Sequence, residues 1–221
     1  MKKLIILLFL SLSVTAFAQK ADTIKKGKLT LVFISNDASF SMVTKQRLID
    51  AFFIVYPKEI NEYNKNSSTL VTFFIDTAYK GVAATSNDKV RFNPDWFVKH
   101  PEDIDVVTHE VMHIVQNYGR TPRNTGWLTE GIADYARWKF GINNEKGGWT
   151  LTEFKPTQSY TNSYRITARF LVWAEKHKNK ELVNKLDDAM RTGKYTPELW
   201  TQLTGKNVDD LWAEYAQNPV I

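Results

Sequence analysis

Two histidines and a glutamate form the part of this sequence with the clearest chemical meaning. His109 and His113 are four positions apart, and Glu110 directly follows the first histidine. Residues four apart lie on one face of an α-helix, so both imidazoles can reach the same metal ion. Glu110 is offset around the helix, where its carboxylate can take a proton from a water that the ion activates. The spacing therefore predicts a catalytic metal site built on a helix.

A third ligand is expected from a separate segment, because a catalytic zinc site has three protein ligands and an open position. Glu130 lies far enough after His113 for one helix to end and a second helix to face it. Asp134 follows Glu130 by four positions and shares its helical face, from which it can accept the free N–H of a ligating histidine. We therefore expect Zn²⁺ to be held by His109, His113 and Glu130, with Asp134 behind one histidine.

Three other interpretations of these residues are open. The five-residue motif also arises by chance in amphipathic helices, where the histidines are solvated or packed in the core. A zinc-containing protein that binds a cell-surface or matrix polymer without turnover is the main alternative, with some of the seven tryptophans lining a groove. More often such tryptophans are core residues. A structural zinc site is disfavoured because those sites are usually rich in cysteine, which the chain lacks. Glu110 favours the enzyme, since zinc binding alone does not need it.

The first 18 residues have the pattern of a signal peptide. Lys2 and Lys3 precede an apolar run that is too short to span a membrane, and residues 16–18 supply small side chains at the cleavage positions. An uncleaved membrane anchor is the alternative. The sequence predicts a secreted or periplasmic protein whose mature chain, residues 19–221, forms one domain.

Composition limits the partners. The 221 residues contain no cysteine, so no disulfide holds the fold and stability must come from a core. The formal charge of +5 is spread among acidic residues without a basic run, which argues against a nucleic-acid surface. No second apolar run is long enough to span a membrane. We expect a peptide or protein substrate, and no feature indicates the oligomeric state.

The pattern of apolar residues predicts an α+β fold in which a sheet and a long helix come first. Strands are expected at residues 28–35, 69–75, 81–85 and 89–92, and a long helix at 41–63 with a kink or break at Pro57. The motif helix should end near Gly119, and further helices should occupy residues 128–140, 164–176, 179–190, 197–203 and 208–216. Strands precede helices rather than alternating with them. The strand at 81–85 or at 89–92 offers a sheet edge that can pair with a peptide, unless both are ordinary inner strands.

The chain resembles the basic secretory protein family, the zinc-peptidase-like proteins of plants and bacteria. The resemblance covers nearly all of the mature chain and is carried by residues 81–83, 108–116, 127–135, 167–171 and 203–215. It implies a zincin-like fold and a zinc metallopeptidase of the glutamate-zincin type. His109, His113 and Glu130 are then the ligands, and Glu110 is the general base.

The resemblance also implies a tyrosine that stabilises the oxyanion from the start of a later helix. Tyr164 fits that position, with Tyr160 as a substitute and a simple packing role as the alternative. The family usually has Gly-Tyr-Asp-Val there, whereas this chain has Ser163-Tyr164-Arg165-Ile166. The tyrosine is kept but its neighbours differ.

Overall fold

The first half of the chain forms a five-stranded mixed sheet in a computed structural model, which describes residues 21–120 and 122–221. The expected signal peptide lies outside the described residues. The strands run in the spatial order β1-β2-β3-β5-β4. Strands β2, β3 and β5 are parallel, and the two edge strands, β1 and β4, are each antiparallel to their neighbour. The strands are β1 Ala21–Lys26, β2 Leu29–Ser35, β3 Leu70–Ile75, β4 Ala83–Ser86 and β5 Lys89–Phe92.

Alternating apolar residues give the sheet a buried face. Leu31 and Phe33 of β2 lie in register with Val71 and Phe73 of β3, and all four side chains are buried. Helix α1, Met42–Glu62, contributes a row of apolar side chains to the same core. This helix continues through Pro57, so the break that was considered there does not occur.

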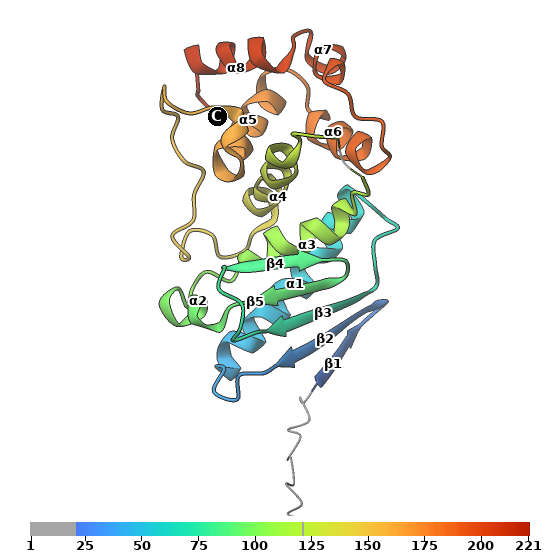
Figure 1. The fold of residues 1–221 in the computed structure, drawn as a ribbon, viewed down its shortest axis with the longest axis vertical. Helices are drawn as coiled ribbons and strands as arrows, with labels where there is room; N and C mark the ends of the chain where they lie inside the picture. The colour runs from blue at the N-terminus through green and yellow to red at the C-terminus, as the bar shows by residue number, and fades with distance from the viewer. Residues whose placement is uncertain (1–20, 121) are drawn as a thin grey trace, which may run out of the picture.

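Helix α3, Val106–Gln116, carries the histidine motif and lies between the sheet and the helices of the second half (Figure 1). It packs on α1 and β4 on one side and on α4, Gly126–Phe140, on the other. It ends at Asn117, which adopts the left-handed conformation, and not at Gly119 as expected. Nearly every side chain of α3 is buried, so the motif is held rigidly between the two halves.

The second half is helical, and Figure 1 shows it stacked over the sheet. Gly131 of α4 lets α5 approach closely, because a Cβ there would lie 2.2 Å from the Thr167 Cγ2 atom of α5. Phe170, Trp200 and Tyr215 join α5, α7 and α8 in one aromatic cluster. The remaining helices are α2 Pro94–Lys99, α5 Tyr164–His177, α6 Leu182–Arg191, α7 Glu198–Thr204 and α8 Val208–Gln217, with a 3₁₀ turn at Tyr160–Asn162.

The mixed α+β class with an early sheet and late helices is confirmed. Strand β1 is the main element that the sequence does not predict, because only Asp22 and Ile24 among its six residues are even partly buried. Among the described residues, no helix is both long enough and apolar enough to cross a membrane.

Candidate metal centre

Helices α3 and α4 bring His109, His113 and Glu130 together. The two Nε2 atoms of the histidines are 3.2 Å apart. Glu130 Oε2 lies 3.3 Å from His109 Nε2 and 3.6 Å from His113 Nε2. Three potential ligand atoms from two helices therefore meet at one point, as the sequence predicts for a metal site.

Hydrogen bonds behind the rings orient both histidines. His109 Nδ1 lies 2.7 Å from Asp134 Oδ1, and His113 Nδ1 lies 2.7 Å from Gln116 Oε1. If each Nδ1–H donates to its oxygen, each Nε2 turns a lone pair toward Glu130. Lone pairs and a carboxylate oxygen this close repel one another unless a metal ion, or a proton on one of the rings, lies between them. Asp134 thus stands where the sequence places it.

The spacing of these atoms fits zinc. Tetrahedral ligands about 2.0–2.2 Å from a zinc ion lie roughly 3.3–3.6 Å from each other. The three observed separations are 3.2, 3.3 and 3.6 Å. Two imidazoles and a carboxylate also match the ligand types of catalytic zinc sites, in which a fourth position stays open.

The electrostatics of the centre favour positive charge. Burial lowers the pKa of His109, but hydrogen bonds to Asp134 and Glu130 outweigh it and raise that pKa to about 10. Burial raises the pKa of Glu130, but the two histidines outweigh it and hold the pKa well below its usual range. Both shifts have the same physical origin, because each group lies next to partners that stabilise its charged form.

Glu110 lies beside the ligand atoms and is held from the sheet. The Thr85 hydroxyl lies 2.6 Å from Glu110 Oε2 and 2.9 Å from the Glu110 backbone oxygen. Thr85 is on the edge strand β4, so this contact ties the carboxylate of α3 to the sheet. The side chain is buried, and it lines the same cavity as the ligands.

Tyr164 lies at the first position of α5, and its ring stacks on His109 with a centroid distance of 6.1 Å and an interplanar angle of 19°. Tyr160 does not line the cavity, and its hydroxyl instead donates to Asp209 at 2.7 Å. The entry to α5 is strained, because Ser163 has φ 66° and ψ −175° and Tyr164 has φ 50°. A residue such as Ser163 rarely adopts this conformation, which glycine adopts readily.

A cavity of about 1050 Å³ opens over these residues. One wall is formed by residues 82–85, which include most of strand β4. The backbone oxygen of Val82 accepts a hydrogen bond from the Asn93 N–H of the neighbouring chain segment. Backbone groups alternate in direction along an antiparallel strand, so those of Ala83 and Thr85 point away from β5, toward the outer edge of the sheet. Of the seven tryptophans, only Trp96 and Trp149 line the cavity. The other five tryptophans lie elsewhere in the fold.

The histidines outside the motif differ in position. His100 and His177 are both exposed, as expected. His100 also lines the cavity, where its ring packs on Trp96 at a centroid distance of 4.0 Å.

Sequence reasoning missed two side chains that hold the site. Gln116 is almost fully buried, and besides contacting His113 it donates from Nε2 to the Thr129 carbonyl oxygen at 2.8 Å. Its position three residues after His113, on the same helical face, is a signal that could have identified it. Thr85 has no such local signal, since its contact with Glu110 exists only in the folded protein.

Comparisons with known proteins give the family of the chain and the likeness of its fold. A family model described as "Peptidase of plants and bacteria" matches residues 14–215. No curated protein sequence matches the chain. An M1 zinc metallopeptidase from Deinococcus radiodurans has a similar structure, with a TM-score of 0.53 and 10% identity over 92% of this chain and 52% of that one. An aminopeptidase N family protein from Idiomarina loihiensis gives a TM-score of 0.53 and 11% identity over 89% of this chain and 46% of that one. The chain spans about half the length of these proteins, and at such low identity the likeness shows the fold alone.

Proposed function

Since the chain belongs to the family of peptidases of plants and bacteria, we propose that it is a secreted, zinc-dependent peptidase with a zincin-like active site of the glutamate type. His109, His113 and Glu130 would hold the metal, and Asp134 would orient His109. The convergence of three ligand atoms within 4.8 Å of one another at the floor of a large cavity is the observation that carries this proposal.

The chemistry of the metal is general, and the protein residues supply the rest. A zinc ion bound by these ligands acts as a Lewis acid and lowers the pKa of a water to about 7. Glu110 takes the proton of the attacking water and delivers it to the departing amine. The Thr85 hydroxyl, 2.6 Å from Glu110 Oε2, holds the carboxylate in one rotamer while the other oxygen remains free for the proton.

Tyr164 is proposed to donate a hydrogen bond to the oxyanion that forms at the attacked carbonyl. Its hydroxyl suits a donor because the negative charge of Glu130, followed by partial burial, raises the pKa of Tyr164 above its usual value. The phenol therefore keeps its proton at neutral pH. The parallel arrangement of its ring and the His109 ring supports this role.

Strand β4 is proposed to bind the backbone of the substrate. As the edge strand nearest the ligand atoms, it can pair with an extended peptide through the outward-facing backbone groups of Thr85 and the N–H of Ala83, whereas the Ala83 carbonyl oxygen already accepts from the Tyr79 hydroxyl at 2.9 Å. A peptide held there would place its carbonyl groups along the row formed by Glu110, the ligands and Tyr164. Peptides or proteins are thus the proposed substrates, and export through residues 1–18 is proposed to deliver the enzyme outside the cytoplasm.

The decisive experiment compares the parent protein with Glu110→Gln. We expect both to bind one zinc ion per chain by elemental analysis, because Glu110 is not a ligand. We expect the parent to cleave members of a peptide library and the variant to be at least about a hundredfold slower, the low end for loss of a general base. If the variant cleaves as fast as the parent, the role of Glu110 is wrong. If the parent binds zinc and cleaves nothing, the alternative of a binding protein without turnover is favoured.

A further inference from the structure

The charged side chains that line the cavity differ in whether another side chain of the protein already contacts their charged group. Four are acidic and two are basic, and they are Asp103, Glu110, Glu130, Asp134, Arg137 and Arg165. Glu130 and Asp134 contact the histidines, and Glu110 accepts from Thr85. These three carboxylates therefore already have partners.

The remaining acid, Asp103, and Arg137 neutralise each other. Arg137 forms a buried ion pair with Asp103 through Nη2, and its Nε donates to Asn144 Oδ1 at 3.0 Å. The Arg137 guanidinium also lies over the Trp149 ring, with its central carbon 4.6 Å from the centroid. The charge of Arg137 is thus already paired within the protein.

Arg165 is the exception. It is the second residue of α5, directly after Tyr164, and it is half-buried. Within residues 21–120 and 122–221, its guanidinium has neither an ion pair nor a hydrogen bond. An arginine head group offers five N–H donors in a planar fork that matches a carboxylate in two parallel hydrogen bonds. Of the two arginines in the cavity lining, Arg165 is therefore the one whose guanidinium is not already paired within the described residues.

We infer that Arg165 recognises a carboxylate of the substrate, so that the enzyme prefers peptides that present a free carboxylate near the cleaved bond. This inference rests on the proposed peptidase function. The carboxylate comes either from an Asp or Glu side chain near the cleaved bond or from the C-terminus of a short peptide. Because Arg165 lines the same cavity as His109, Glu110 and Glu130, it can bind groups of a peptide that occupies the proposed active site, where binding affects the rate.

The test uses matched pairs of fluorogenic peptides. In one series Glu replaces Gln at each position on either side of the cleaved bond, and in the other a free C-terminus replaces an amide. We expect kcat/KM of the parent to favour one carboxylate form by about tenfold, the value of a good charge-assisted hydrogen bond. The series that shows the preference identifies the source of the carboxylate.

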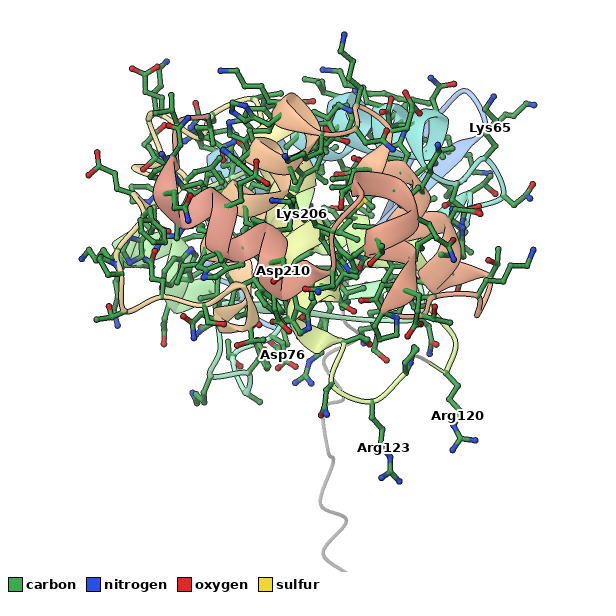
Figure 2. All side chains as sticks on the ribbon, turned by 90° about the horizontal axis from the view of Figure 1, so that it is seen from above. Lys65, Asp76, Arg120, Arg123, Lys206 and Asp210 are labelled. Atoms are coloured by element: carbon green, nitrogen blue, oxygen red, sulfur yellow. The ribbon has the colours of Figure 1, made fainter. Side chains whose placement is uncertain are left out.

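Three variants of Arg165 separate charge from shape. The preference should disappear in Arg165→Gln, reverse in Arg165→Asp and largely persist in Arg165→Lys. Arg123→Gln is the matched control, because Arg123 points into solvent from the loop between α3 and α4 and should keep the parental preference (Figure 2). If Arg165→Asp keeps the parental ratio of acidic to neutral cleavage, the inference is wrong while the peptidase function stands.

A binding measurement separates the two proposals if the parent cleaves nothing. Zinc-loaded Glu110→Gln is titrated with the same labelled peptides, and binding is followed by fluorescence anisotropy. If Glu110→Gln binds the carboxylate form more tightly and the double variant with Arg165→Gln does not, the role of Arg165 is supported even without turnover. Equal binding of acidic and neutral peptides overturns it.

Discussion

Gln116 is expected to control how tightly the site holds zinc, although it does not contact the metal position. Its buried amide contacts His113 Nδ1 with one end and the Thr129 carbonyl with the other, so it joins α3 to α4 next to the ligand Glu130. In Gln116→Leu, a ring N–H and a backbone carbonyl lose their partners inside the protein. Each buried polar group left unsatisfied costs roughly 1–3 kcal/mol, part of which the apolar leucine offsets.

The expected magnitude follows from these two contacts. Loss of the oxygen behind a ligating histidine typically weakens metal binding by about 10–100-fold. We therefore expect the zinc Kd of Gln116→Leu to rise by about 10–100-fold and its free energy of unfolding without metal to fall by about 2 kcal/mol. Zinc affinity is measured by competition with a chromophoric chelator, and stability by urea unfolding of the metal-free protein.

Two further variants make this experiment specific. Gln116→Glu keeps an acceptor for His113 but loses the donor to Thr129. Its zinc affinity should therefore be closer to the affinity of the parent than the affinity of Gln116→Leu is. Gln202→Leu, at an exposed position of α7, controls for replacing a helical glutamine. A zinc Kd of Gln116→Leu within twofold of the parent would refute the claim that this hydrogen bond supports the metal site.

Three further predictions follow from single contacts. Thr85→Val should lower kcat about tenfold and leave the zinc affinity unchanged, because only the hydroxyl holds the proposed base Glu110. Thr85→Ser keeps the hydroxyl and should have the kcat of the parent. Equal kcat values for the Val and Ser variants would contradict this role. Ser163→Gly should stabilise the protein by about 1–2 kcal/mol in urea unfolding, since it removes the strain of a positive φ, and a loss of stability would count against that strain. Burial raises the pKa of Asp187 to about 6 although Arg191 and Tyr118 oppose it, so the folded state binds more protons than the unfolded chain between about pH 4 and 6. The parent therefore loses stability as pH rises through this window. Between pH 4 and 7 the free energy of unfolding of Asp187→Asn should rise by up to about 3 kcal/mol relative to that of the parent. A difference between the two proteins that does not change with pH would show that folding does not raise the pKa of Asp187.

The sequence predicts the parts of the site that depend on helical periodicity. The four-residue spacings of His109 to His113 and of Glu130 to Asp134 place each pair on one helical face, and the structure brings both faces together. Thr85 and Arg165 could not be predicted in this way. Their importance depends on which side chains surround them in the cavity, and that is decided by packing between distant segments.

Strand β1 shows the same limit for the fold. Its residues alternate weakly and remain mostly exposed, so the stretch lacks the apolar pattern that marks a strand. All six residues of β1 nevertheless pair with β2 in antiparallel register. Without β1, the backbone groups of β2 that face away from β3 would have no partner in the sheet. Backbone pairing can therefore form an edge strand that side-chain patterns do not reveal.

The relative placement of the proposed ligand Glu130 and Tyr164 depends on one close contact between helices. Gly131 directly follows Glu130 and touches Thr167, which lies three residues after Tyr164. Because the missing side chain of Gly131 sets how near α5 comes to α4, it also sets how near the tyrosine hydroxyl can come to the metal ligands. In a zinc peptidase of this type, the third ligand and the oxyanion donor must act on the same carbonyl. A glycine with no chemistry of its own is thus a requirement of the proposed mechanism, and its spatial role follows from packing rather than from any motif.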